Sequence, residues 1–427
     1  MKTFNEGPDQ QRKWMKLVII FAIIFGCFCR LIWNEDMEWK GDEQYNFSAS
    51  RDIVENKNWP MLGPTSSFKG VAQPSLGIWA FGILGFIAKD PLSLNRAVEI
   101  LNILAILGFC LFIFFRVEKS QREVWFWGMA LAAVNPMAIL FSRKLWIQDL
   151  LPFFCLLVIF SHTLRQYRLG AFLWGLFGMI IGQIHMLGFF YAFSIFIFTW
   201  SYDVLVLRQK SIRWGYWLTG ILVGSVPLIP WMVRLIFQLG TFAVHTPGQY
   251  SFYELWYKGS LGLRQEYSLG HAFLALFYQE PMLGNFPTYG VKILRTYLSF
   301  IGYLSLAALG IKIFFWLKRD NILDSFKYIT LLDFYIITMV CFYGGILTAL
   351  NIPMVDHYLI FVFPFLSLYL VRCLFPMRHL LVSVIICQAV LSWLFLGFIH
   401  KHGGVTEGDY GISYKQKMKI QKEIGDS

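Results

Sequence analysis

Two adjacent carboxylates, Asp42 and Glu43, are the residues whose types and spacing best suit chemistry. They closely follow the first long apolar run of the chain, in the stretch WKGDEQYN. A carboxylate at a membrane interface that excludes part of the water is protonated more easily, because desolvation disfavours its charged form. Such a group can take a proton from an attacking hydroxyl. The pair therefore suggests a general base, and a solvated acidic loop is the alternative that the pair alone leaves open.

Four further polar clusters lie at the ends of apolar runs. They are Arg143 with Trp146 and Asp149, Gln183 with His185, His357 with Tyr358, and Lys292 with Arg295. Arg143 can clamp a phosphate with its planar fork, and the later basic residues can neutralise a phosphate head group. Snorkelling, anchoring at the interface or bonding to a neighbouring helix are the alternatives. All five clusters fall on one predicted membrane face, which indicates an active site or a transport gate there.

The amino-acid composition indicates what kind of structure carries these residues. Of 427 residues, 57% are hydrophobic and 15% are charged, whereas a soluble domain carries about 25% charged residues. A soluble globule cannot cover itself with so few charges, so lipid must replace water around much of the chain. The sequence therefore predicts an all-α polytopic membrane protein. The net charge of +11 lies mostly in short links between apolar runs, where it reports orientation rather than nucleic-acid binding.

Eleven candidate spans emerge from the apolar runs. They are residues 16–33, 95–116, 123–142, 149–164, 170–187, 188–207, 214–238, 292–317, 328–350, 357–373 and 379–399. No small-residue cleavage site follows the first run, so we expect it to be retained as a span. The seven cysteines all lie in apolar runs without metal-ligand spacing, which is typical of packing residues.

Basic links place the N-terminus in the cytoplasm and two long connections outside. The outer connections cover residues 34–94 and 239–291, and both are rich in aromatic residues and proline. Residues 73–88 are apolar but too short to span, which predicts a helix lying in the interface. The aromatic cluster at 250–257 predicts a second one. The transmembrane domain thus covers residues 1–400, and an odd span count places the polar tail, 401–427, outside.

Several of these features together resemble a known family. The acidic pair after the first span, the SRKLWIQDLLPFF run from residue 142 and the Gln183-Ile184-His185 motif are similar to the bacterial branch of the dolichyl-phosphate-mannose-protein mannosyltransferase-like family. Its members are membrane glycosyltransferases of the GT-C fold, and the aminoarabinose transferases of lipid A are relatives. The resemblance covers roughly residues 15–375.

The resemblance implies an inverting transfer of a sugar from a polyprenyl-phosphate donor to a lipid, glycan or protein acceptor. The reaction would take place at the outer face of a bacterial inner membrane. Asp42 would be the base, and Glu43 would orient it or bind the acceptor. The donor and its phosphate would be held by a set of mainly polar residues: Arg143, Asp149, Lys69, Lys292, Arg295, His357 and Tyr358. The acceptor site or pocket would contain Tyr45, Trp146, Gln183 and His185.

This chain departs from the relatives at a position that matters for the phosphate. Gln73 stands where the aminoarabinose transferases have a lysine, so Lys69 is the candidate substitute. No cofactor is required by the sequence, and a divalent metal is compatible with it if Asp42, Asp149 and His357 approach one another. A transporter or flippase of a lipid-linked sugar is the competing hypothesis, although such proteins tend to carry repeats and broken helices at the bilayer midplane. An acyltransferase would need a nucleophile relay that His185 and His357 do not match.

Overall fold

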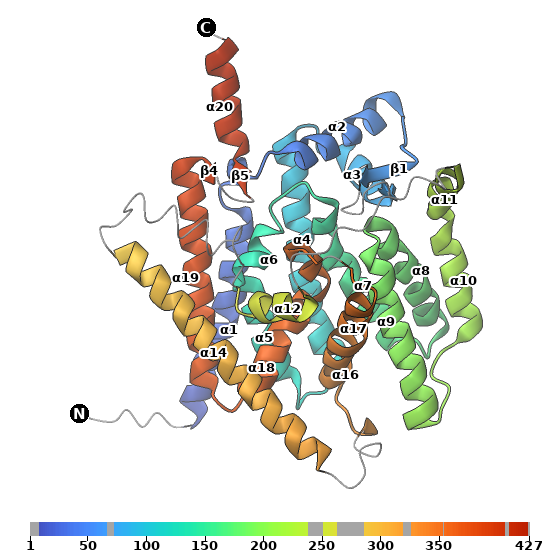
Figure 1. Ribbon diagram of the computed structural model, residues 1–427, viewed down its shortest axis with the longest axis vertical. Helices are drawn as coiled ribbons and strands as arrows, with labels where there is room; N and C mark the ends of the chain where they lie inside the picture. The colour runs from blue at the N-terminus through green and yellow to red at the C-terminus, as the bar shows by residue number, and fades with distance from the viewer. Residues whose placement is uncertain are drawn as a thin grey trace.

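The computed structural model describes residues 8–65, 72–237, 251–262, 286–318, 326–352, 354–405 and 410–425. Within these ranges the chain is almost entirely helical, and its few strands are two to four residues long. The predicted all-α membrane class is therefore confirmed. Figure 1 shows long helices forming a bundle.

Eight of the described helices are long and apolar enough to cross a membrane. They are Lys13–Leu31, Pro91–Arg116, Leu187–Leu207, Trp214–Arg234, Ile293–Trp316, Leu331–Ala349, His357–Leu374 and Arg378–His402. The predicted number of eleven is not confirmed, because three predicted spans correspond to shorter helices than the roughly 20 residues that a bilayer needs. These are α5 (Arg122–Val134), α7 (Leu151–Thr163) and α8 (Arg168–Ile184).

The other helices follow the predicted apolar runs, and several of these runs form two shorter helices instead of one. They are α1 (Pro8–Leu31), α4 (Pro91–Arg116), α9 (Leu187–Ser201), α10 (Trp214–Ser225), α11 (Ile229–Phe237), α14 (Phe286–Leu317), α16 (Leu331–Ile337), α17 (Gly344–Ala349), α18 (Phe363–Leu374) and α19 (Arg378–His402). Turns of π-helix follow α9 and α16, at Tyr202–Leu207 and Thr338–Tyr343. The 3-10 segments Val226–Leu228 and Asp356–Val362 precede α11 and α18. The sequence pattern located these helices, but not their interruptions.

One interruption has a clear local cause. Asn135 ends α5 in an extended conformation and starts α6 (Pro136–Leu140). Its side-chain oxygen accepts hydrogen bonds from the backbone N–H groups of Met137 and Ala138, at 3.0 and 3.3 Å. This is an N-cap followed by proline at the first helical position, which is a favoured start for a helix. The chain therefore turns away before residues 142–149 instead of completing one straight span.

Close helix contacts depend on glycine at a few positions. The helices α8 and α10 approach so closely that a Cβ atom at Gly220 would clash with the carbonyl oxygen of Phe172. A Cβ at Gly175 would likewise clash with the carbonyl oxygen of Trp217. Small residues allow membrane helices to pack backbone against backbone. Elsewhere the core is filled by large side chains, among them the fully buried Trp125 and Trp127 of α5.

The first outer connection forms a layer at the end of the bundle that lies opposite the N-terminus in Figure 1. It contains the 3-10 turn η1 (Asn34–Asp36), α2 (Gly41–Asn56), the hairpin β1 (Leu62–Thr65) and β2 (Ala72–Pro74), and α3 (Leu76–Gly85). The helix predicted within 73–88 is thus present as α3. The Ser50 hydroxyl donates to the carbonyl of Phe81 at 2.9 Å, which joins α2 to α3.

Part of the second outer connection is described as α12 (Phe252–Ser260). The predicted helix is present, but its aromatic residues do not all face an interface. Phe252 and Trp256 are buried. Their rings contact Tyr343 and Tyr369 at centroid distances of 5.7 and 6.0 Å. The helix is therefore packed into the body of the protein, because its large apolar side chains find aromatic partners there.

The C-terminal tail returns to the first outer connection. After α19 come the strands β4 (Gly404–Val405) and β5 (Gly411–Ile412) and the helix α20 (Tyr414–Gly425). The backbone N–H of Trp39 donates to the Ile412 carbonyl at 3.3 Å, and that of Tyr414 donates to the Met37 carbonyl at 2.9 Å. The tail and the first outer connection therefore lie on the same side, as the odd span count predicts.

Candidate active site

The C-terminal end of α1 is tied to the loop between α6 and α7 by Arg143. Its guanidinium is almost fully buried. It donates to the carbonyls of Cys29, Ile32 and Trp33, at 2.7, 2.6 and 2.9 Å. The last carbonyls of a helix lack intrahelical partners, and a basic side chain commonly satisfies them. The predicted phosphate clamp is therefore already engaged with backbone, and a phosphate role for Arg143 stays a prediction.

The next residue, Lys144, lies in a buried group that we call the charged cluster. Its members are Glu38, Glu43, Lys144 and Asp149, each no more than 1% exposed. The Lys144 ammonium forms an ion pair with one carboxylate oxygen of Glu38, and Lys40 pairs with the other at 2.5 Å. Buried charges persist only when they are paired or hydrogen-bonded. Lys144 therefore supplies the buried positive charge around which the carboxylates gather.

Glu43 enters this cluster from the first turn of α2. One of its carboxylate oxygens accepts a hydrogen bond from the Lys40 backbone N–H at 2.9 Å, as in a capping box. Burial and, to a lesser extent, the negative charge of Glu38 raise the pKa of Glu43, the positive charge of Lys144 lowers it, and the net result is a pKa of about 7. A carboxyl group with a pKa near neutrality can hold or release a proton under working conditions.

Asp149 closes the cluster from the other side. It lies in the 3-10 turn η2 (Ile147–Leu150), directly before α7. Its carboxylate is fully buried and interacts electrostatically with Lys144, Glu43 and Glu38. Neither of its oxygens makes a hydrogen bond to another described side chain. The structure therefore joins the predicted residues Glu43 and Asp149, about 100 positions apart in sequence, within one charged environment.

An aromatic patch adjoins the cluster. It consists of Trp146, His185, His357 and Tyr358. The His357 ring lies 5.4 Å from Trp146 and 6.4 Å from His185, and the Tyr358 ring lies 5.4 Å from His185. Lys144 connects the two groups, because its ammonium lies 4.2 Å from the centre of a Trp146 ring. All four residues of the patch were predicted as site residues from three separate motifs, and the fold brings them together.

The chain as a whole is similar to solved structures, although no family model and no curated protein matches the sequence. It is similar to ArnT from Cupriavidus metallidurans in the apo state, with 13% identity, a TM-score of 0.48 and coverage of 87% of this chain. It is also similar to the Archaeoglobus fulgidus oligosaccharyltransferase in complex with Zn and sulfate, with 15% identity, a TM-score of 0.48 and coverage of 96% of this chain. This chain spans 61% and 55% of the lengths of those two chains. A likeness at this level carries no conclusion about chemistry.

The acidic pair is divided between two environments. Glu43 is buried in the charged cluster, whereas Asp42 is exposed on the outer side of α2. Successive residues on a helix point about 100° apart, so adjacent carboxylates cannot share one face. Tyr45 lies one turn after Asp42 and is 45% exposed. The predicted base and the predicted acceptor residue therefore share the outer face of α2, away from the buried cluster.

Other predicted residues are not joined to the cluster. The Gln183 amide donates to the carbonyls of Met179 and Gly224, at 3.0 and 2.6 Å, so it bonds a neighbouring helix. Arg295 lies on α14, and no described contact joins it to the cluster. Lys292 also lies on α14, but its side chain lies outside the described residues. The whole of Lys69 lies outside them as well.

The predicted metal set is not assembled. Among the described residues, the group of three with ligand atoms within 4.8 Å of one another consists of Glu35, Asp36 and His400. His400 already pairs with Asp36 at 2.6 Å. Burial raises the pKa of Asp36, and the hydrogen bond from His400 opposes that shift. These contacts describe a local hydrogen bond between His400 and Asp36, and metal binding stays a prediction.

Three parts of the site were not predicted from the sequence, namely Glu38, Lys144 and the tail. Tyr410 is buried over the cluster, with its ring centre 5.8 Å from the Lys144 ammonium and its hydroxyl donating to the Asp36 carbonyl. Ser413 forms an isolated β-bridge with Glu38. The Tyr410-Gly411-Ile412 sequence, with glycine between two apolar residues, is the signal that could have predicted a short docking strand.

Proposed function

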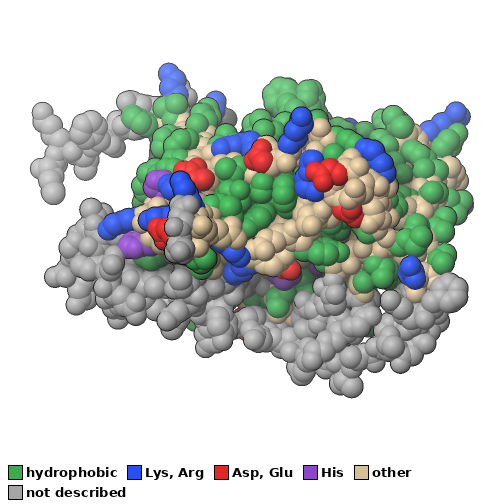
Figure 2. Space-filling model, turned by 90° about the horizontal axis from the view of Figure 1, so that it is seen from above, with side chains coloured by type: hydrophobic (Ala, Val, Ile, Leu, Met, Phe, Trp, Pro, Cys, Tyr) green, Lys and Arg blue, Asp and Glu red, His purple; other side chains and the backbone are tan. Residues whose placement is uncertain are grey.

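We propose that this protein is a membrane glycosyltransferase that moves a sugar from a polyprenyl-phosphate donor to an acceptor at the outer face of the membrane. The observation that carries the proposal is the charged cluster, in which Glu43, with a pKa near 7, lies beside buried Lys144. The aromatic patch adjoins it. Figure 2 views the molecule from above and shows Lys, Arg, Asp and Glu side chains close to hydrophobic ones on this end. Such a position suits a lipid-borne substrate with a polar head.

The chemistry needs one base and one counter-charge. The acceptor hydroxyl attacks the anomeric carbon, its proton passes to a carboxylate, and the bond from that carbon to the phosphate oxygen breaks. The lipid phosphate leaves with the electron pair of that bond. A single displacement inverts the anomeric centre without a covalent intermediate. Lys144, the buried positive charge of the cluster, would stabilise the negative charge that develops on the phosphate.

Two carboxylates compete for the role of the base. The family resemblance assigns the base to Asp42, which is exposed and open to an acceptor. The pKa of about 7 favours Glu43, because a base works best when its pKa lies near the operating pH. Removal of a positioned base costs about 10²- to 10⁴-fold in rate. The residue whose substitution reduces the rate of transfer more, Asp42 or Glu43, is therefore assigned as the base.

The decisive experiment uses purified protein in lipid nanodiscs and a panel of radiolabelled polyprenyl-phosphate sugars. We expect one donor to be consumed with release of polyprenyl phosphate, and Glu43→Gln to reduce this by at least about 10²-fold. Asp42→Asn is compared under the same conditions, and Lys89→Gln, an exposed change in the same outer connection, is the matched control. If no donor is consumed, or if both acidic variants keep full activity, the proposal is wrong.

A further inference from the structure

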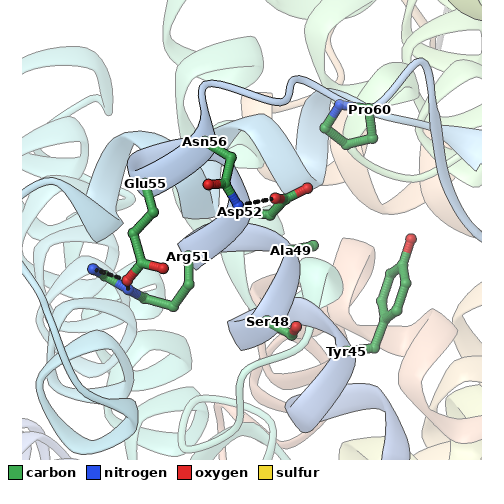
Figure 3. A pocket seen from close by; sticks show the side chains of 8 residues that line it. All are labelled: Tyr45, Ser48, Ala49, Arg51, Asp52, Glu55, Asn56 and Pro60. Atoms are coloured by element: carbon green, nitrogen blue, oxygen red, sulfur yellow. Dashed lines mark hydrogen bonds and ion pairs between the residues drawn. The ribbon is translucent and has the colours of Figure 1, made fainter.

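An open groove runs along the outer face of α2. It is lined by Tyr45, Ser48, Ala49, Arg51, Asp52, Glu55, Asn56 and Pro60, and it has a volume of about 430 Å³. Figure 3 shows Tyr45 and Pro60 on one side of the helix and the Arg51–Glu55 pair on the other. Small-molecule sites commonly have volumes of about 300–1,000 Å³. The groove is therefore large enough to bind a small ligand.

Helical spacing places the groove on the same face of α2 as Asp42, the base that the resemblance implies. Residues three and four apart lie on one face of a helix, with Cβ atoms about 5–6 Å apart. Asp42, Tyr45, Ala49 and Asp52 follow this spacing along α2. The groove therefore begins one turn from Asp42. A ligand in it extends toward the first turn of α2, where both members of the acidic pair are located.

The lining offers both kinds of hydrogen-bonding group. Asp52 accepts bonds from the side-chain amides of Asn56, at 2.8 Å, and Asn58, at 2.5 Å, which hold its carboxylate in place. Arg51 pairs with Glu55 at 2.7 Å. A hydroxyl group can donate to the carboxylates and accept from the amides and the guanidinium. A ligand with many hydroxyl groups can therefore satisfy this lining without carrying a charge.

The charge of the lining argues against an anion. Arg51 contributes one positive charge, and Asp52 and Glu55 contribute two negative charges, so the groove carries a net charge of −1. Like charges repel a phosphate or a uronate. The polar lining also argues against an acyl chain, which would leave these groups unsatisfied.

The groove also lacks the features that recognise an extended peptide. Most of its lining lies on α2, whose backbone groups are bonded within the helix, so α2 offers no strand edge. Exposed aromatic surface is present instead. Tyr45 is 45% exposed, and Trp59, next to Pro60, is 42% exposed. Trp79 fixes this corner, because its indole N–H donates to the Pro60 carbonyl at 2.8 Å. Flat aromatic faces beside fixed polar groups suit the apolar face of a sugar ring.

We propose that the α2 groove binds the acceptor, and that the acceptor is a neutral, hydroxyl-rich carbohydrate. Its role as acceptor depends on the proposed glycosyl transfer, whereas its binding does not. The sugar ring lies against Tyr45, its hydroxyl groups bond to Asp52 and Asn56, and its reacting hydroxyl points toward the first turn of α2.

Binding is tested without donor, by saturation-transfer NMR on the full chain in nanodiscs. The probes are mannobiose, cellobiose and chitobiose, with a uronic-acid disaccharide and a short serine-containing peptide for comparison. We expect at least one neutral disaccharide to bind. Tyr45→Ala and Asp52→Asn should each weaken it about tenfold, which corresponds to about 1.4 kcal/mol. Tyr45→Phe keeps the aromatic ring and should retain most of the affinity for the disaccharide, so it shows that a substitution at this position does not by itself misfold the protein. Lys89→Gln is the matched surface control.

The groove proposal is overturned if no neutral disaccharide binds, if Tyr45→Ala and Asp52→Asn bind as tightly as the wild type, or if the uronic acid or the peptide binds more tightly. Donor consumption by the wild type is measured in parallel. Donor turnover without disaccharide binding would reject the groove but support the transferase. Disaccharide binding without donor turnover would support the groove as a sugar site but reject the transferase.

Discussion

The two faces of α2 differ in almost every physical property, although they belong to one short helix. Glu43, Asn46, Ser50 and Ile53 are buried, and the side chains of the first three enter polar contacts with other segments. The opposite face carries Asp42 and the open groove. The buried face holds the helix in place and sets the protonation of a carboxylate, whereas the exposed face is free to meet a ligand. Adjacent acidic residues therefore acquire different properties because the helix turns between them.

The largest effect is expected when Lys144, the positive charge that interacts with Glu43 on the buried face of α2, is removed. Lys144→Met leaves the carboxylates of Glu38, Glu43 and Asp149 without their buried partner. Breaking a buried pair by removing one member costs about 3–5 kcal/mol. We expect a clear decrease in the thermal unfolding temperature of the protein in detergent. Lys89→Met, which changes an exposed lysine, should leave it nearly unchanged. Equal unfolding temperatures for the two variants would show that the cluster is not stabilised by Lys144.

The second prediction concerns pH. The pKa of Glu43 is raised from 4.5 to about 7, so the folded protein binds more protons than the unfolded chain between these values. Stability from this group is therefore greatest at low pH and falls as pH rises from about 4.5 to 7, by on the order of 3 kcal/mol.

The pH prediction is checked by comparing wild type with Glu43→Gln in chemical unfolding at several pH values. The difference in stability between the two proteins should change across this window and be flat above it. A pH-independent difference would contradict the raised pKa. If Glu43 is the base, the rate of transfer should also rise with pH through about 7.

A third, intermediate effect is expected at the tail that covers the buried face. Gly411 has a φ of 70° and packs against the Lys40 side chain. Gly411→Val should cost about 1–3 kcal/mol in the docking of the tail, because a β-branched residue is strained at positive φ. Faster backbone hydrogen exchange in residues 36–43 should report it. Gly425→Val, at the open end of α20, is the control, and equal exchange in both variants would show that the tail does not protect this segment.

The smallest effect is expected on the exposed face. Asp42→Asn removes a charge from the first turn of α2, where it favours the helix dipole, and should cost less than about 1 kcal/mol. Its unfolding temperature should stay close to that of the wild type, even if its activity falls. A destabilisation as large as that of Lys144→Met would mean that the two faces do not differ as the structure indicates.

The membrane class, the positions of most helices and several site residues could be predicted from the amino-acid sequence. Apolar runs and scarce charges are local properties, so they predict helices without knowledge of packing. The resemblance and the predicted topology brought Trp146, His185, His357 and Tyr358 to one membrane face, and the structure shows them in ring contact. The buried carboxylates Glu43 and Asp149 were likewise identified from their motifs.

The tertiary structure alone decided which predicted groups face one another. Arg143 was predicted to hold a phosphate, and the structure shows its guanidinium donating to backbone carbonyls at the end of α1, while its neighbour Lys144 enters the cluster. Gln183 bonds to Gly224 of α10 rather than to the site. The tail, which the sequence places far from residue 38, covers the cluster through backbone pairing. Such contacts depend on where helices end and cross, and a side chain's neighbours across a bundle leave no periodic signal in the sequence.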